Sequence, residues 1–214
     1  MQALQLRADG TFLDALAARG ASARVSLPAH VASVAFFAAL TAATAQFSVH
    51  LPFTQVPVTL QPIVVLLSGL VLGARLGAIS QCLYLAAGIA GLPVFALSAT
   101  LPMGPMRLLG PTGGYLMAYP FAALLVGACA ERGLDRRWAG AGLAMLLGLA
   151  VIYACGVLWL GYFARLGGAS AAIGLGPAYA TGIAPFAIAD VLKIAVAAGV
   201  VPGLWKLVGP AGVR

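Results

Sequence analysis

Charged side chains are so sparse in this chain that long stretches of it could not stay dissolved in water. Only 8% of the residues are Asp, Glu, Lys or Arg, and 62% are hydrophobic, whereas a soluble domain averages about 25% charged and about 45–50% apolar residues. These proportions exclude a soluble globular domain and a disordered chain. A membrane span needs about 20 apolar residues, so the chain has room for about five to seven spans and for no large soluble domain.

Six apolar segments are candidates for membrane spans. They cover residues 28–49, 63–73, 78–91, 115–130, 139–163 and 183–201, with a tight turn at residues 74–77. The segments 50–62 and 92–115 are rich in proline or glycine, yet they are also apolar. Irregular backbone at membrane depth is tolerated only where protein buries it or where it lines a cavity. We therefore predict an all-α membrane protein with six transmembrane helices and long ordered outer loops.

The basic residues predict the orientation of the chain. With six spans and a cytoplasmic N-terminus, nine basic residues lie inside and two, Arg107 and Arg165, lie outside, while Lys193 falls within a span. Lys and Arg concentrate in cytoplasmic loops, so we expect both termini to be cytoplasmic. The same bias accounts for the net charge of +7 without a nucleic-acid partner. The inside set is Arg7, Arg19, Arg24, Arg75, Arg132, Arg136, Arg137, Lys206 and Arg214.

The two ends of the chain fall outside the transmembrane domain, which is expected over residues 28–205. Asp9 and Asp14 interrupt the apolar core that a cleaved signal peptide would need. We expect residues 1–27 to form a cytoplasmic N-terminal extension, either as a short interfacial helix or as a disordered tail. Residues 206–214 are expected to form a cytoplasmic tail.

Asp190 and Lys193 interrupt the last apolar segment, which otherwise has the character of a lipid-embedded helix. Their i, i+3 spacing places both side chains on one helix face. An ionised group at this depth costs a few kcal/mol or more, so both should face the bundle interior or a wet cavity. They either neutralise each other as a structural pair or anchor a polar ligand. In the second case the carboxylate accepts N–H donors and the ammonium meets an oxygen.

The proline- and glycine-rich segment around Arg107 offers a second set of candidate ligand contacts. The guanidinium can bind a carboxylate through two hydrogen bonds, or it can reach toward lipid headgroups. Gly114 and its glycine neighbours allow the backbone to approach a ligand closely, although plain turns use the same residue. Tyr115 and Tyr84 can stack on a ligand, or they can lie at the membrane interface as aromatic residues commonly do.

Other patterns bear on partners and on catalysis. Ala35, Ala39 and Ala43 form small-xxx-small steps along the first span, which allow another helix to approach closely. The sequence has no HExxH, no GxSxG and no paired-carboxylate motif, and its acidic residues are four Asp and one Glu. We therefore expect no enzyme activity, no metal and no cofactor.

Four blocks of the sequence, three of them in loops, resemble the BioY family, the biotin-specific substrate-binding (S) components of energy-coupling-factor transporters. The resemblance extends over about residues 30–205. Gln55 departs from the family pattern, in which proline is common at that place. The blocks are PFTQVPVTLQP (Pro52 to Pro62), GLVLGARLGAISQCLYLAAGIAGLPVFA (Gly69 to Ala96), LLGPTGGYLMAYPFAALLVG (Leu108 to Gly127) and PFAIADVLK (Pro185 to Lys193).

The resemblance implies a six-helix fold with one biotin site near the outer face. The D-x-x-K pair would meet the ureido ring, whose two N–H groups and one carbonyl complement an aspartate and a lysine. Residues 57–59 and 110–115 would form loops that close over the ligand, and our own inference makes Arg107 the partner of the valerate carboxylate. The expected substrate-binding set is Asp190, Lys193, Arg107, Tyr115, Thr112, Gly114, Thr59 and Tyr84.

The resemblance also implies partners and a location. The partners would be biotin, a transmembrane coupling protein and two ATPase subunits that hydrolyse ATP, with the chain as a multi-pass protein of the bacterial cytoplasmic (inner) membrane. Ala35, Ala39 and Ala43 would meet the coupling protein. Two other functions stay open at this point. One is the same fold with another vitamin, such as thiamine or riboflavin, and the other is an intramembrane enzyme of lipid metabolism that uses Asp190 as a base.

Overall fold

The structure is a computed structural model that describes residues 26–98, 101–164 and 173–208. Within these ranges the one β pairing is an isolated bridge between Val49 and Val58, so the prediction of an all-α fold is confirmed. The described elements are α2 (Leu27–Gln46), α3 (Gln61–Ile89), α4 (Met106–Leu109), α5 (Gly113–Glu131), the 3-10 helix η1 (Leu134–Arg136), α6 (Trp138–Tyr162), α7 (Leu175–Gly182), α8 (Ala187–Ala197) and α9 (Val200–Val208).

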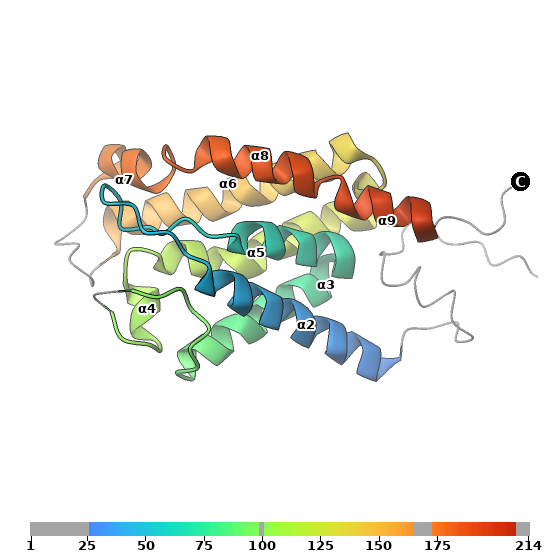
Figure 1. The fold of residues 1–214 in the computed structure, drawn as a ribbon, viewed down its shortest axis with the longest axis horizontal. Coiled ribbons are helices and arrows are strands. Elements are labelled where there is room, and N and C mark those ends of the chain that lie inside the picture. The colour runs from blue at the N-terminus through green and yellow to red at the C-terminus, as the bar shows by residue number, and fades with distance from the viewer. Residues whose placement is uncertain (1–25, 99–100, 165–172, 209–214) are drawn as a thin grey trace, which may run out of the picture.

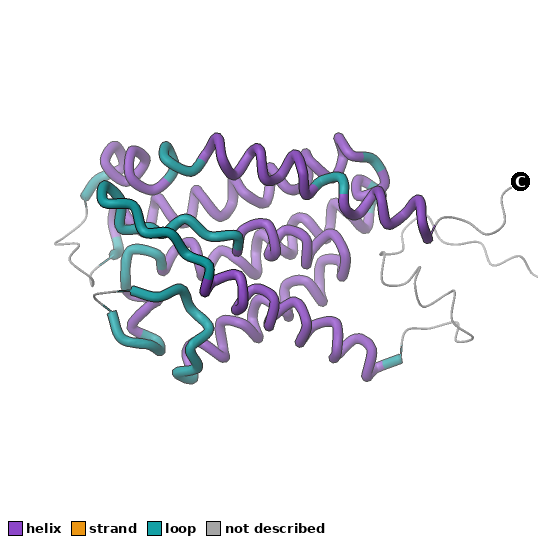
Figure 2. Tube along the Cα trace, in the orientation of Figure 1, coloured by secondary structure: helices purple, strands orange, loops and turns teal. Residues whose placement is uncertain are grey.

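Five helical stretches of the described chain are long and apolar enough to cross a membrane. They are Leu27–Gln46, Gln61–Ile89, Gly113–Glu131, Trp138–Tyr162 and Ala187–Lys206. Figure 1 shows the helices extending along the long axis of the molecule, with α4 and α7 at one end and α9 at the other. Figure 2 shows most of the loops gathered at the end that holds α4 and α7. The irregular segments expected from proline and glycine therefore lie together.

Helix α3 reverses direction at Gly73. This residue has φ 81° and ψ −179°, which is not a helical conformation. Gln61 Nε2 lies 2.7 Å from the Tyr84 hydroxyl although the two residues are 23 positions apart. In a straight helix they would be about 35 Å apart. Residues 61–72 and 74–89 are therefore two antiparallel limbs, which Figure 1 shows as the teal and green parts of α3.

The reversal comes slightly earlier than the turn that the sequence predicts, because residues 74–77 are already helical. The limbs approach closely where glycine faces glycine: a Cβ atom added to Gly77 would lie 2.9 Å from the Gly69 Cα. Glu131, at the end of α5, accepts a hydrogen bond from the Ala74 amide over 2.8 Å. A carboxylate therefore caps the first turn of the second limb, where the helix dipole favours negative charge.

Polar side chains inside the bundle join α2 to both limbs of α3. Thr41, Ser68 and Gln81 are fully buried. Thr41 donates to Gln81 Oε1 over 3.3 Å, and Gln81 Nε2 donates to Ser68 Oγ over 3.1 Å. A polar side chain that faced hydrocarbon would lose such partners. These hydrogen bonds therefore determine which faces of the three helical segments turn inward.

The last predicted span, residues 183–201, is divided in the structure between α8 and α9, and α7 occupies the end of a segment expected to be a loop. Trp205 of α9 donates to the Asp135 carboxylate in η1, and the Arg136 guanidinium lies 5.2 Å from the Trp205 ring. Burial raises the pKa of the Asp135 carboxyl. These contacts hold α9 against the connection between α5 and α6.

Some predictions concern parts of the chain that lie outside the described residues, namely 1–25, 165–172 and 209–214. The N-terminal extension and most of the C-terminal tail fall there, and so does Arg165. The choice between an interfacial helix and a disordered tail for the N-terminal extension therefore stays open.

We expect Gly73→Ala to destabilise the protein, because φ 81° with ψ −179° belongs to a region open essentially to glycine alone. The strain should cost about 1–3 kcal/mol and lower the thermal unfolding midpoint in detergent. Gly176→Ala is the matched control, since a Cβ atom there would meet nothing within 4 Å. Equal midpoints for the wild type and both variants would contradict the assigned reversal.

Candidate functional site

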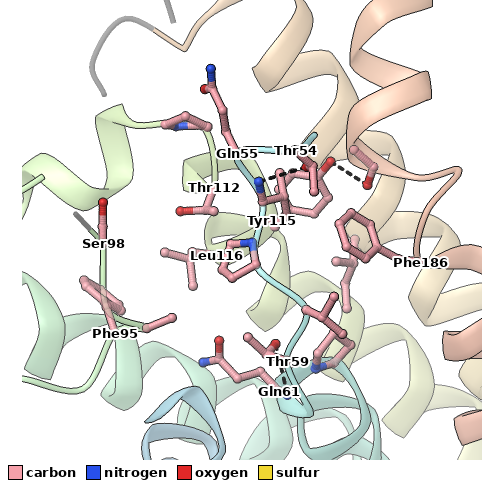
Figure 3. A pocket seen from close by; sticks show the side chains of 18 of the residues that line it. Thr54, Gln55, Thr59, Gln61, Phe95, Ser98, Thr112, Tyr115, Leu116 and Phe186 are labelled. Carbon is pink, nitrogen blue, oxygen red and sulfur yellow. Dashed lines mark hydrogen bonds between the residues drawn. The ribbon is translucent and has the colours of Figure 1, made fainter. Parts of the chain in front are cut away.

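A cavity of about 250 Å³ lies between the irregular segments and the helices beneath them. Residues 50–62 and 95–98, the first turns of α5, and parts of α6 and α8 contribute to its wall. Figure 3 shows Thr54 and Gln55 at one side of this space and Thr59 and Gln61 at the opposite side. The cavity is therefore enclosed by segments that are far apart in the sequence.

Five of the eight predicted site residues line this cavity and three do not. Those in the wall are Asp190, Arg107, Tyr115, Thr112 and Thr59. Those outside the wall are Lys193, Tyr84 and Gly114. The sequence therefore locates most of the wall correctly, and the other three residues have contacts of a different kind.

Asp190 is the acidic group of the wall, and two donors hold its carboxylate. Lys193 Nζ lies 2.8 Å from Oδ1, and the Tyr153 hydroxyl donates to Oδ2 over 2.7 Å. The prediction that Asp190 and Lys193 share an inward face is confirmed. Only 7% of Asp190 is exposed, and its two partners offset the cost of a charge at membrane depth.

Lys193 lies behind the wall, between Asp190 and the loop that covers the cavity. Its ammonium donates to the Thr59 carbonyl over 3.2 Å as well as to Asp190. One cation therefore joins α8 to the loop that precedes α3. Within the structure its role is to hold two wall segments together.

Arg107 is buried in the wall and does not reach toward lipid headgroups. Its Nε donates to the Pro102 carbonyl over 3.0 Å, and its Nη1 donates to the Ala96 carbonyl over 2.8 Å. A guanidinium has five N–H donors, so these bonds occupy only part of its capacity. Burial lowers the pKa of Arg107. His50 lies next to the same backbone, with Nε2 3.1 Å from the Leu97 carbonyl oxygen.

Two carbonyls at the end of α7 join different parts of the wall. Tyr115 of α5 donates to the Gly182 carbonyl over 3.0 Å. Thr54, in the loop between α2 and α3, donates to the Thr181 carbonyl over 2.7 Å. The loop therefore closes one side of the cavity by direct attachment to α7.

Gly114 and Tyr84 have packing contacts and are not part of the cavity wall. A Cβ atom added to Gly114 would lie 2.2 Å from the Trp159 Cβ, so this glycine allows α5 to pack against α6. Tyr84 is buried, its hydroxyl is bonded to Gln61 and its ring meets the edge of Phe95. Their assignment to the ligand stays a prediction.

Sequence reasoning missed several wall residues. Tyr153 and Tyr119 each add a phenol to the wall, and Phe186 adds an apolar ring. The one available signal was that Tyr153 is a hydroxyl in the middle of a long apolar segment. Tyr119 precedes a proline inside α5, yet neither pattern says which way a side chain points.

The fold and the cavity together define the class of protein to which this chain belongs. The described part of the chain is a helical, multi-pass membrane protein with a small cavity, lined by apolar and polar groups, at the end that holds the loops. Among the described residues, no group of three or more His, Cys, Asp and Glu side chains could hold a metal ion. Apolar rings together with a carboxylate, a guanidinium and phenols give the cavity a lining suited to a small organic ligand.

A family model described as "BioY family" matches residues 18–210. The chain therefore belongs to the BioY family, and the resemblance of its four sequence blocks is confirmed.

The relatives and a solved structure agree with this assignment. A probable biotin transporter BioY from Pyrococcus horikoshii is 41% identical over 167 residues, which cover 78% of this chain and 90% of the relative. The biotin transporter BioY of Thermotoga maritima is 36% identical, over 74% of this chain and 86% of the relative. The crystal structure of the S-component for biotin from an ECF-type ABC transporter matches with a TM-score of 0.72 and 25% identity, covering 85% of this chain and 95% of that one.

We expect Thr54→Val to loosen the loop of residues 50–57, because it removes the bond that the Val56 amide donates to the Thr54 hydroxyl and the bond that this hydroxyl donates to the Thr181 carbonyl. At about 0.5–1.5 kcal/mol for each bond, amide hydrogen exchange in the loop should speed up by roughly 5-fold to 150-fold. Thr181→Val is the matched control: it keeps the carbonyl that accepts the bond from Thr54 and removes a hydroxyl that bonds only within α7. Unchanged exchange in Thr54→Val would show that these bonds do not hold the loop.

Proposed function

We propose that the chain is the biotin-binding S-component of an uptake transporter of the energy-coupling-factor type and is not an enzyme. The observation that carries this proposal is the buried Asp190 carboxylate in the cavity wall of a chain that belongs to the BioY family. An Asp–Lys ion pair at membrane depth is costly, and ionisable residues there commonly mark a ligand site or a transport path. Purified wild-type protein should therefore bind biotin at equilibrium.

The wall has groups that suit both ends of biotin. Asp190 offers acceptors for the two N–H groups of the ureido ring. Arg107 supplies a positive charge suited to the valerate carboxylate, and His50 lies close by, bonded to the neighbouring backbone carbonyl. Apolar side chains such as Phe186 and Leu116 line the space as well, and they suit the thiophane ring and the aliphatic chain. Tyr115, Thr112 and Thr59 complete the proposed contact set.

Lys193 has a supporting part in this proposal. Its ammonium neutralises Asp190 and ties it to the Thr59 carbonyl, so it orients the acceptor without touching the ligand. The same geometry argues against an intramembrane enzyme. The Lys193 ammonium and the Tyr153 hydroxyl occupy both oxygens of the Asp190 carboxylate, and no nucleophile is among these partners.

We also propose that the chain crosses the membrane six times and that both of its termini are cytoplasmic. The two limbs of α3 support six crossings, since each limb is a separate helical segment. Arg75 follows the reversal at Gly73, and Glu131 beside it joins that turn to the basic connection between α5 and α6. Basic residues therefore gather at the end away from Arg107, as expected of the cytoplasmic face. We place the protein in the bacterial inner membrane, with residues 28–205 as the substrate-binding domain.

The proposed partners are a transmembrane coupling protein and two ATPase subunits. Helix α2 is the least buried of the five helices that are long enough to cross a membrane. Ala35, Ala39 and Ala43 are all exposed on it. A stripe of small side chains lets a second helix approach closely in lipid, so this face of α2 is the proposed surface for the coupling protein.

We expect Asp190→Asn and Lys193→Met each to weaken biotin binding, measured at equilibrium on folded protein. Truncating one member of a buried charge pair costs roughly 2–5 kcal/mol, much of it from the partner left alone. This corresponds to about 30-fold to several-thousand-fold weaker binding. The loss of binding free energy in the double variant should be clearly smaller than the sum of the losses in the two single variants, because the double variant leaves no lone charge.

The contrasting result is that of a purely structural pair. In that case the single variants would unfold at lower temperature while the folded fraction bound biotin with wild-type affinity. Wild-type affinity in Asp190→Asn would therefore end the assignment of this carboxylate to the ligand.

We expect Ala39→Trp to reduce co-purification of the coupling protein and to leave biotin binding intact, since a bulky side chain prevents close helix approach. Ala150→Trp is the control, because Ala150 is also exposed but lies on α6. Equal recovery of the coupling protein with both variants would argue against the α2 surface.

A further inference from the structure

Most of the phenols around the cavity already donate to a protein acceptor. Tyr153 donates to Asp190 Oδ2 over 2.7 Å, and Tyr115 donates to the Gly182 carbonyl over 3.0 Å. A phenol has one O–H donor, so these two can offer a ligand only an oxygen lone pair. Together with the Asp190 carboxylate, they make this part of the wall a set of acceptors.

Tyr119 differs from these two residues. It lines the cavity and is only 4% exposed, yet within the described part of the chain its hydroxyl has no hydrogen-bond partner. The ring is held in place by stacking on Tyr84, with centroids 6.3 Å apart and planes at 29°. Asp190 is near enough to act electrostatically on the hydroxyl. The hydroxyl oxygen is not fully enclosed by protein, so this donor is available to a molecule in the cavity.

The helix turn that holds Tyr119 also provides an acceptor. Pro120 follows it inside α5, and a proline has no N–H to donate to the carbonyl one turn earlier, at Leu116. Leu116 lines the cavity as well. Pro120 therefore leaves the Leu116 carbonyl without its usual helical partner in the turn of α5 that holds Tyr119.

We infer that the Tyr119 hydroxyl donates a hydrogen bond to the carbonyl oxygen of the ligand's ureido ring. The inference rests on the proposed function, in which Asp190 accepts the N–H groups of that ring. A ureido ring needs acceptors for two N–H groups and a donor for one oxygen. Lys193, the donor expected from the sequence, lies behind the wall and is already bonded to Asp190 and Thr59.

Other donors near the wall are engaged or less buried. Gln61 Nε2 donates to the Tyr84 hydroxyl and to the Thr41 carbonyl. Thr59 and Thr112 are only half-buried, so water can satisfy their hydroxyls when the cavity is empty. Arg107 also keeps unused N–H groups, but the proposed function assigns them to the valerate carboxylate, so Tyr119 is the donor left for the ureido oxygen.

The test is equilibrium binding of two ligands to the full-length wild type and to Tyr119→Phe. The ligands are biotin and its thione analogue, in which sulfur replaces the ureido oxygen and accepts hydrogen bonds poorly. Tyr119→Phe should bind biotin roughly 5-fold to 100-fold more weakly than the wild type, as expected when a buried acceptor loses its donor. The affinity for the thione analogue should fall by less than about 3-fold in Tyr119→Phe, because the thione forms little of this hydrogen bond with the wild type.

Tyr162→Phe is the control, because Tyr162 is an exposed phenol at the end of α6 that lies outside the wall. It should keep wild-type affinity for biotin. Unchanged biotin binding in Tyr119→Phe, or an equal loss for both ligands, would overturn the inference while leaving the proposed function standing. If Tyr119→Phe does not fold, the wild type alone decides, since equal affinity for biotin and the thione would overturn it too. A wild type that binds no biotin would overturn the proposed function itself.

Discussion

The interior of a bilayer supplies no hydrogen bonds, so each polar side chain within the bundle has to find its partner inside the protein. This constraint accounts for the contacts between α2 and the limbs of α3, where Thr41, Gln81 and Ser68 bond to one another. It also accounts for Asp190, whose two oxygens are held by Lys193 and Tyr153. The positions of the helices around the cavity depend on these few interactions.

The cavity is built in two layers, each with its own physical role. The wall consists of groups from the loops, α5, α6 and α8. Behind it, Lys193 joins Asp190 to the Thr59 carbonyl, and Gln61 joins Tyr84 to α2. The hydrogen bonds from the residues behind the wall restrict the side chains of the wall to few rotamers. A wall that is oriented before a ligand arrives loses less conformational entropy when the ligand binds.

The sequence predicts the acidic end of the site well, because spacing along one helix decides it. Asp190 and Lys193 are one helical turn apart, and the cost of exposing either charge to lipid turns that face inward. Gly114 and Tyr84 lie outside the wall, and their residue types could not say so, because a glycine or a tyrosine suits a ligand contact and a helix contact equally well. Tyr153 and Tyr119 were missed for a related reason. Periodicity in a uniformly apolar helix does not say which face meets a cavity.

Composition and local spacing by themselves determined that the chain is a helical membrane protein, that its irregular segments are apolar and that one aspartate and one lysine share a face. These properties follow from free energies of transfer and from the helical repeat, and both act along the chain. Only the tertiary structure decided that Lys193 stands behind the wall, that Tyr119 has an unused hydroxyl and that α3 folds back at Gly73. Such features depend on which segments pack together, and close packing joins residues that no sequence interval relates.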